Sequence, residues 1–184
     1  MTRTIAHTTP YAWPWDGAFA PSRTAMLVVT VPGAPAPGAR VKALAGALRP
    51  AGGVVVQVTT APPRAARAPA AETWGSADER VASAGVDGFF GSSLDGLLRS
   101  RGRDQLLLTG AWLETSVHST MRSANDRGYE CLLVLDACAA YDPDLVVASR
   151  SQIEMSGGIF GAVGSTDDVL AAVAASLTTE RTTA

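Results

Sequence analysis

The sequence has little of three residue types that often carry enzyme chemistry. Its 184 residues include two histidines, two cysteines and a single lysine, Lys42, beside fourteen arginines. The histidines lie far apart and no Cys/His/Asp cluster has the spacing of zinc ligands, so we expect no metal site. Two cysteines, Cys131 and Cys138, are too few for a disulfide framework, and we expect both to be reduced and partly buried.

Other absences exclude classes of partner and cofactor. A net charge of −2 with scattered arginines gives no basic field for a polyanion, so no nucleic acid partner is expected. No apolar run approaches the roughly 20 residues that span a bilayer, and the opening "MTRTIAHTTPYAWPW" lacks the apolar core of a signal peptide. We therefore expect a cytoplasmic protein with no membrane partner. "GAPAPG" lacks a phosphate-loop lysine and "GGIFGAVG" lacks dinucleotide-fingerprint spacing, so no cofactor is predicted.

What the sequence does have is an alternation of short apolar runs and helical patterns. The chain is 47% hydrophobic and long enough for one domain, which we expect over 23–180 after an N-terminal arm at 1–22. Strands rich in Val and Leu are predicted at 25–31, 53–60, 104–110, 130–137 and 159–163. Helices are predicted at 40–49, 92–101, 116–127, 143–155 and 166–177. This order predicts an α/β fold, a three-layer doubly wound domain with a mainly parallel sheet.

Two segments, 32–39 and 61–88, interrupt the alternation. Both are rich in Pro, Ala and Gly and are predicted as loops, and the second is long enough to form a lid or flap. In the predicted third helix, Val117, Met121 and Ala124 recur at i, i+4 and i+7. They form one apolar stripe that we expect to pack on the sheet.

The ends of the predicted strands indicate where a ligand would bind. In open parallel sheets the site lies at the carboxyl ends of the strands. The residues delivered there are 30–32, 59–60, 110–112 and 136–138. The start of the third predicted helix, around Ser116, faces the same crevice with free backbone N–H groups and the positive end of its dipole.

Four stretches in order resemble one family. "YAWPWDGAFAPSRTAMLVV", "FFGSSLDGLLRSRG", "TSVHSTMRSANDRGYECLLVLDACAAYDPD" and "GGIFGAV" are similar to the isochorismatase-like cysteine hydrolases, in particular the subgroup of biuret and ureidoacrylate amidohydrolases. The resemblance implies a doubly wound α/β fold and a homo-oligomer, a dimer or larger. It also implies an aspartate, a lysine and a cysteine whose thiolate attacks an amide-type carbonyl while backbone N–H groups hold the oxyanion.

The three family positions carry other residues in this chain. The resemblance places Thr30 at the aspartate, Ser83 at the lysine and Ser116 at the cysteine, so these are catalytic candidates by position and the triad is replaced. A serine nucleophile needs a neighbouring base, and the candidate is His118, but i and i+2 on a helix do not face each other. We therefore expect Ser116 to cap the helix start and His118 to lie on the surface.

Further acids and lining residues complete the candidate site. Asp87, Glu114 and Asp136 are possible acids or bases, each with an ordinary role in loop solvation, helix N-terminal charge or fixing a strand end. The predicted substrate-binding residues are Trp112, Ala111, Glu114, Thr115 and Phe89. Trp112 stands in a turn where smaller residues are usual, so it either fills space or offers a flat apolar surface.

Three functions stay open at this point. The first is a repurposed enzyme that acts without a covalent intermediate on a small, mostly apolar metabolite, by hydrolysis, elimination or cyclisation, for instance in bacterial specialised metabolism. The second is a catalytically inactive pseudoenzyme that serves as a ligand-binding or structural partner. The third is a residual amide hydrolase that uses Ser116. A large, closed, preformed pocket at Ser116 favours an enzyme or a ligand binder, and a crevice filled by Trp112 and segment 61–88 favours a scaffold.

Overall fold

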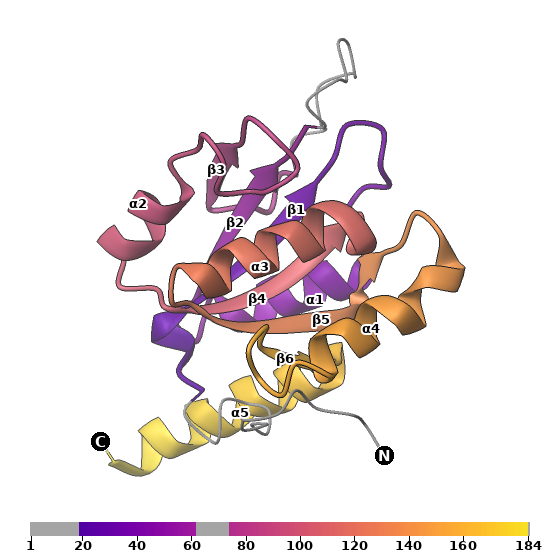
Figure 1. Ribbon diagram of the computed structural model, residues 1–184. Helices are drawn as coiled ribbons and strands as arrows, with labels where there is room; N and C mark the ends of the chain where they lie inside the picture. The colour runs from indigo at the N-terminus through magenta and orange to yellow at the C-terminus, as the bar shows by residue number, and fades with distance from the viewer. Residues whose placement is uncertain (1–18, 62–73, 184) are drawn as a thin grey trace.

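Six parallel strands form a single sheet in the order β3-β2-β1-β4-β5-β6 (Figure 1). The computed structural model describes residues 19–61 and 74–183. The strands are β1 (Thr24–Thr30), β2 (Val54–Thr59), β3 (Glu79–Ala82), β4 (Gln105–Ala111), β5 (Glu130–Ala139) and β6 (Ala162–Gly164). The order steps outward from β1 in both directions, so the predicted doubly wound α/β fold is confirmed, with the first strand inside the sheet.

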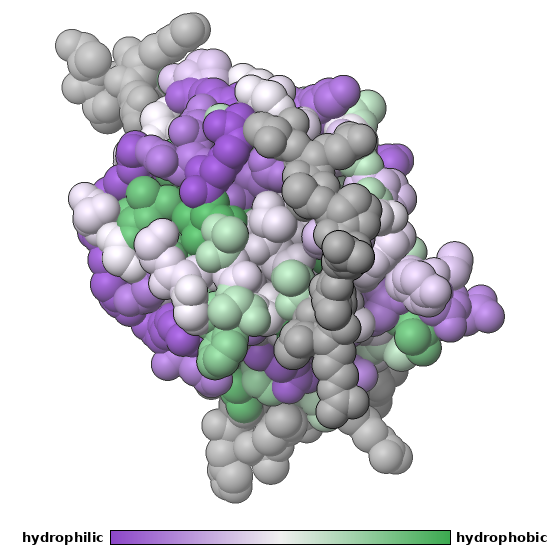
Figure 2. Space-filling model, turned by 90° about the horizontal axis from the view of Figure 1, so that it is seen from above, coloured by the Kyte–Doolittle hydropathy of each residue, from purple (hydrophilic) through white to green (hydrophobic). Residues whose placement is uncertain are grey.

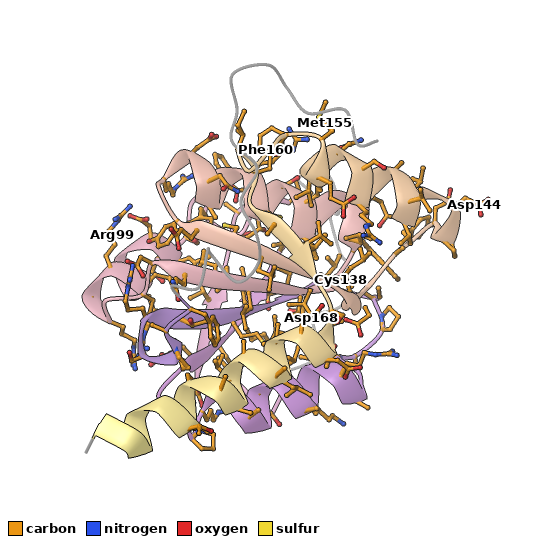
Figure 3. The ribbon with its side chains drawn as sticks, turned by 90° about the horizontal axis from the view of Figure 1, so that it is seen from below. Arg99, Cys138, Asp144, Met155, Phe160 and Asp168 are labelled. Carbon is orange, nitrogen blue, oxygen red and sulfur yellow. The ribbon has the colours of Figure 1, made fainter. Side chains whose placement is uncertain are left out.

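Helices cover both faces of the sheet. They are α1 (Ala39–Leu48), α2 (Leu94–Ser100), α3 (His118–Asp126), α4 (Val146–Glu154) and α5 (Thr166–Thr183). The described chain also forms short helical turns, which are η2 (Pro21–Arg23), the π-helical η3 (Leu113–Val117) and η4 (Pro143–Leu145). Helices α1 and α5 lie together on one face (Figure 3), and α2, α3 and α4 cover the other. The result is the predicted three-layer arrangement.

Alternation along the buried strands builds the two halves of the core. In β1, Leu27 belongs to the core cluster under α2, α3 and α4, and its neighbour Met26 belongs to the cluster under α1 and α5. The predicted stripe of α3 is confirmed, since Val117, Met121 and Ala124 are all buried in the first of these clusters. Every residue of β1 is buried, as expected for a strand covered on both faces.

The prediction of an uninterrupted loop at 61–88 is wrong. Residues 79–82 form β3, an edge strand that pairs with β2 through Val58 and Val81. The pattern was missed because only Val81 is buried while Glu79 and Arg80 are polar, and an edge strand needs few apolar residues. Residues 62–73 of that segment, and residues 1–18 of the predicted arm, lie outside the described part of the chain.

Most large apolar side chains lie inside these layers. On the face seen from above, hydrophobic residues of the described chain gather in small groups among hydrophilic ones (Figure 2). Within residues 19–61 and 74–183, the large hydrophobic residues that are exposed are Phe90, Tyr141, Leu145, Val147, Met155 and Ile159. Among the described residues, no helix combines the length and the apolar character needed to cross a bilayer.

Candidate functional site

The three residues that the resemblance places at the family's catalytic positions, Thr30, Ser83 and Ser116, meet at the carboxyl end of β2 and are called the family positions below. The Thr60 N–H donates to the Thr30 carbonyl oxygen over 2.9 Å, and the Thr30 and Thr59 hydroxyl oxygens lie 3.2 Å apart. The Ser83 N–H donates to the Thr59 carbonyl oxygen over 2.9 Å, and the Thr60 hydroxyl donates to Ser116 Oγ over 2.9 Å. Thr30, Thr59, Thr60, Ser83 and Ser116 are called the hydroxyl cluster below.

The hydroxyl cluster is buried or half-buried, and its hydroxyls pair as Thr30 with Thr59 and Thr60 with Ser116, while the Ser83 hydroxyl donates to the Gly85 carbonyl oxygen over 2.8 Å. Exposure is 7% at Thr30, 0% at Thr60 and 3% at Ser116, and Gln57 Nε2 donates to Thr30 Oγ1 over 3.2 Å. All five side chains are neutral alcohols. A serine becomes a nucleophile when an adjacent base takes its proton, but the partner of Ser116 is another hydroxyl. The arrangement therefore satisfies polar groups, and it gives Ser116 no base.

Ser116 is not a helix-start cap, so that prediction is wrong. A cis peptide joins Ala111 to Trp112 at the end of β4, and the π-helical η3 follows it. Ser116 is the fourth residue of η3, and its side chain accepts from Thr60 instead of from a helix N–H. Its carbonyl oxygen accepts from the Thr120 hydroxyl over 2.7 Å. The bond from Thr60 holds Ser116 against the end of β2.

His118 is buried, which corrects the prediction of a surface residue. Its exposure is 8% and its Nδ1 accepts from Arg122 Nε over 3.3 Å. The Arg122 guanidinium lies 4.1 Å from the Phe160 ring centroid, so the loop before β6 covers this side of α3. Burial, and then the Arg122 charge, lower the pKa of His118 below its ordinary value. Within the described residues no hydrogen bond joins His118 to Ser116.

Asp87 and Phe89 have structural contacts. The Asp87 carboxylate accepts from the Phe89 N–H over 2.9 Å and from the Ser123 hydroxyl over 2.8 Å, which ties the turn before α2 to α3. Phe89 is 5% exposed and its ring lies 5.7 Å from that of Tyr129. Both residues therefore help to hold the segment before α2 in place.

An open cavity lies at the carboxyl ends of β1, β4 and β5, and no residue of the hydroxyl cluster lines it. Its volume is about 250 Å³, and segment 35–41, which leads into α1, forms one wall. The strands contribute Val29, Gly110, Ala111, Asp136, Ala137, Cys138 and Ala139. Figure 3 shows Cys138 at the opposite end of the strands from Arg99. The side chains that line the cavity are mostly small and apolar.

One ion pair supplies the charge on the cavity lining. Arg40 Nε lies 3.0 Å from Asp136 Oδ2. The other carboxylate oxygen accepts from the Thr166 N–H over 2.7 Å and from its hydroxyl over 3.0 Å, at the start of α5. Asp136 therefore fixes the end of β5 against two helices, and its charge is compensated.

The predicted substrate-binding residues lie in different places. Ala111 lines the cavity. Trp112 is half-buried and packs edge-on against Tyr141, with ring centroids 5.4 Å apart. Thr115 is exposed, and Glu114 Oε1 accepts from the Asp142 N–H over 2.7 Å. The binding roles of these residues stay predictions.

Sequence reasoning missed the cavity wall at 35–41 and the Arg40–Asp136 pair. The signal that could have found the wall is its place directly after β1, because the loops at the carboxyl ends of parallel strands surround the site. Within 19–61 and 74–183, no group of three or more His, Cys, Asp or Glu residues is placed to hold a metal ion.

The two cysteines are expected to resist alkylation in the folded protein. Cys131 is fully buried and Cys138 half-buried, and desolvation raises the pKa of both thiols far above the ordinary value. Because the thiolate is the reactive form, iodoacetamide at neutral pH should add little mass to the native protein. Intact-mass measurement checks this, with full labelling after denaturation as control. Rapid native labelling of Cys138 would contradict it.

Comparison with known sequences identifies the family of this chain. A model of the isochorismatase domain matches residues 27–168. Ureidoacrylate amidohydrolase RutB of Pseudomonas savastanoi pv. phaseolicola is 36% identical over 81 residues, which cover 44% of this chain and 32% of that protein. The isochorismatase family protein YddQ of Bacillus subtilis is 39% identical over 51 residues, 28% of each chain. The matched segments thus span about a third or less of these curated relatives.

Solved structures share the fold. A cysteine hydrolase from Pseudomonas syringae pv. phaseolicola superposes with a TM-score of 0.75 at 21% identity, covering 92% of this chain and 99% of that one. The nicotinamidase SaPncA of Staphylococcus aureus gives a TM-score of 0.63 at 19% identity, covering 77% and 98%. Since the domain model matches most of its length, the chain belongs to the isochorismatase family.

Proposed function

We propose that this family member is a repurposed enzyme that acts without a covalent intermediate on a small, mostly apolar metabolite. The hydroxyl cluster is the observation that carries the proposal. The positions aligned with the family's aspartate, lysine and cysteine are Thr30, Ser83 and Ser116, which are neutral and bonded to the end of β2. A covalent mechanism needs an activated nucleophile. Hydrolysis, elimination or cyclisation of a bound metabolite can instead rely on shape and fixed hydrogen bonds.

The cavity at the carboxyl ends of β1, β4 and β5 supports the size and polarity of the proposed ligand. Its 250 Å³ lies just below the range of about 300–1,000 Å³ that holds drug-sized ligands, so a smaller molecule fits. The alanines, prolines and Val29 that line it favour contact with an apolar ligand surface, while the Arg40–Asp136 pair offers hydrogen bonds at one point. A mostly apolar metabolite with one polar group would match both the apolar lining and this ion pair.

A second candidate, an inactive ligand-binding partner, has its own supporting observation. Ser116 is 3% exposed, and none of the three family positions lines the cavity. A ligand could then bind in the cavity without meeting any residue at a family position. Turnover of a bound ligand would separate the enzyme from the binder. The third candidate, an amide hydrolase using Ser116, needs a base that the Ser116–Thr60 bond does not provide.

The experiment is a screen of small apolar fragments, each with one polar group, by ligand-observed NMR, followed by product analysis for each binder. The proposal expects binders that Val29 and Ala137 contact, as seen by their shifted resonances, and at least one that is converted. Binding without conversion across related compounds would favour the inactive partner. No binder at all would contradict both.

Two variants test the role of Ser116 against that of its neighbour. Ser116→Ala should weaken fragment binding or turnover by about 0.5–1.5 kcal/mol at most, because the hydroxyl it removes makes one neutral hydrogen bond, with Thr60, and does not line the cavity. Trp112→Ala should weaken it more, because the indole packs on Tyr141 directly beyond cavity-lining Ala111 and an aromatic contact outweighs a hydroxyl. Titrations of fragment binding and assays of product formation for the two variants side by side provide the measurement. A collapse of product formation confined to Ser116→Ala, with Trp112→Ala neutral, would mean that Ser116 is a working nucleophile.

A further inference from the structure

A second cavity lies where the edge strand β6 ends before its neighbour β5. The last paired residues of the two strands are Val134 and Gly164, and β5 continues as far as Ala139. Residues of β5, α4, β6 and the first turn of α5 line this space, which is called the β6-edge cavity below. Its volume is about 450 Å³, within the range of about 300–1,000 Å³ that is typical of sites for small organic molecules.

Three aliphatic side chains form the apolar part of the β6-edge cavity. Leu135, Val146 and Val163 line it from β5, α4 and β6. Each is half-buried and packs against the core cluster under α2, α3 and α4. Apolar surface that remains at a cavity wall gains free energy when a ligand removes it from water. The cavity therefore favours a ligand with an apolar body.

The charged side chains that line the β6-edge cavity include one carboxylate without a cationic partner. Asp136 is paired with Arg40 over 3.0 Å, and Arg150 Nε lies 2.8 Å from Glu154 Oε1, so both arginines already have an acidic partner. Within residues 19–61 and 74–183, Asp168 forms no ion pair. The charge that is left unmatched on the lining is negative.

Asp168 belongs to the first turn of α5, at the same end of the sheet as Cys138 (Figure 3). Its Oδ2 accepts from the Ser165 hydroxyl over 2.6 Å and from the Ser165 N–H over 2.8 Å. These two bonds lower the pKa of Asp168 below its usual value, so the carboxylate is ionised at neutral pH. No hydrogen bond within the described chain uses Asp168 Oδ1, which can accept from a ligand.

We propose that the β6-edge cavity binds a small organic amine with an apolar body. The protonated amine donates to Asp168 Oδ1 and supplies the positive charge that this carboxylate lacks. Its apolar body lies against Leu135, Val146 and Val163. An anion fits less well, because it would meet the carboxylates of Asp136 and Asp168. The site shares only Asp136 with the 250 Å³ cavity, and it does not depend on the proposed function.

Three phenyl compounds of different charge test the proposal on the wild-type protein. 2-Phenylethylamine, 2-phenylethanol and 3-phenylpropanoate are titrated into it while the methyl resonances are followed by NMR. The amine should bind at least about fivefold more tightly than the alcohol, the gain of a partly exposed ion pair, and should weaken as NaCl is added. It should shift the resonances of Val146 and Val163. Equal binding of amine and alcohol, tighter binding of the carboxylate, no binding at millimolar concentration, or shifts confined to Val29 and Ala137 would each overturn the proposal.

Asp168→Asn and Asp167→Asn form a matched pair of variants. Both remove one negative charge from the first turn of α5, but only Asp168 lines the cavity. Asp168→Asn should weaken binding of 2-phenylethylamine at least about fivefold, and Asp167→Asn less than about twofold. Because Asp168 also accepts from Ser165, binding of 2-phenylethanol and thermal unfolding check that the cavity is intact in the variant. If Asp168→Asn does not fold, the wild-type titrations decide. Equal losses in the two variants would show attraction to a negative surface without a site, and would overturn the proposal.

Discussion

Gly110→Ala is expected to prevent stable folding. Gly110 has φ +110°, and a Cβ at that position would lie 2.0 Å from the carbonyl oxygen of Val29 and 2.7 Å from its nitrogen. Those are backbone atoms of the neighbouring strand β1, so they cannot move aside as a flexible side chain can. Steric overlap and an unfavourable φ together should cost more than about 4 kcal/mol, a large part of the stability of an ordinary domain.

Gly46→Ala is the matched control. Gly46 lies in α1, and an added Cβ would have no heavy atom within 4 Å. Alanine in a helix interior is more stable than glycine by about 0.5–1 kcal/mol, so this variant should gain stability. Urea unfolding of both variants makes the comparison. A Gly110→Ala protein that unfolds within about 1 kcal/mol of wild type would contradict the close approach of β4 to β1.

Filling the cavity is expected to remove fragment binding. Ala137 lines the cavity and is buried, and Ala139 lines it from the same strand. Leucine at either position adds three carbon atoms to a space of about 250 Å³. Affinity for fragments should fall at least about tenfold, or 1.4 kcal/mol, because the added side chain and the ligand compete for one volume.

The control for cavity filling is leucine at an exposed alanine. Ala43→Leu, on the outer side of α1, should leave fragment affinity unchanged. Thermal unfolding of all three variants checks that lost binding is not lost folding, since overpacking can cost about 1–3 kcal/mol. Unchanged affinity in both Ala137→Leu and Ala139→Leu would place the fragments elsewhere on the protein.

Short sequence patterns predicted the strands and helices whose own residues show a run or a regular spacing of apolar side chains. The buried strands β1, β2, β4 and β5 contain runs of Val and Leu, and the stripe of α3 repeats every three to four residues, so both were found. Strand β3 was not, because one buried valine in four residues gives no periodic signal. An edge strand is specified by its neighbour, which no short window contains.

The missed features of the site depend on contacts between distant segments. Thr60 meets Ser116 across 56 positions of sequence, and His118 is buried because the loop with Phe160 covers Arg122 beside it. Thr30 and Ser116 were predicted to face one crevice, and contacts with the end of β2 bring both of them and Ser83 together. Their neutrality follows from residue type and was predictable, but their hydrogen-bond partners were not.

Replacing Ser116 with cysteine is expected to leave the protein without amidase activity. A thiolate needs groups that lower its pKa, and the positions that would supply an aspartate and a lysine hold Thr30 and Ser83. The neighbouring Thr60 hydroxyl is neutral and buried, so it offers little help. An assay of amide hydrolysis on Ser116→Cys checks this, and activity in that variant would show that a different base serves residue 116.

The absence of a covalent intermediate is tested most directly by trapping. The wild-type protein is incubated with a carbonyl electrophile, and its intact mass is measured beside that of Ser116→Ala, which lacks the hydroxyl in question. Non-covalent chemistry predicts no adduct at residue 116, because the Ser116 hydroxyl accepts from Thr60 and has no base within its hydrogen bonds. A stoichiometric acyl adduct at Ser116 that is missing in Ser116→Ala would contradict it.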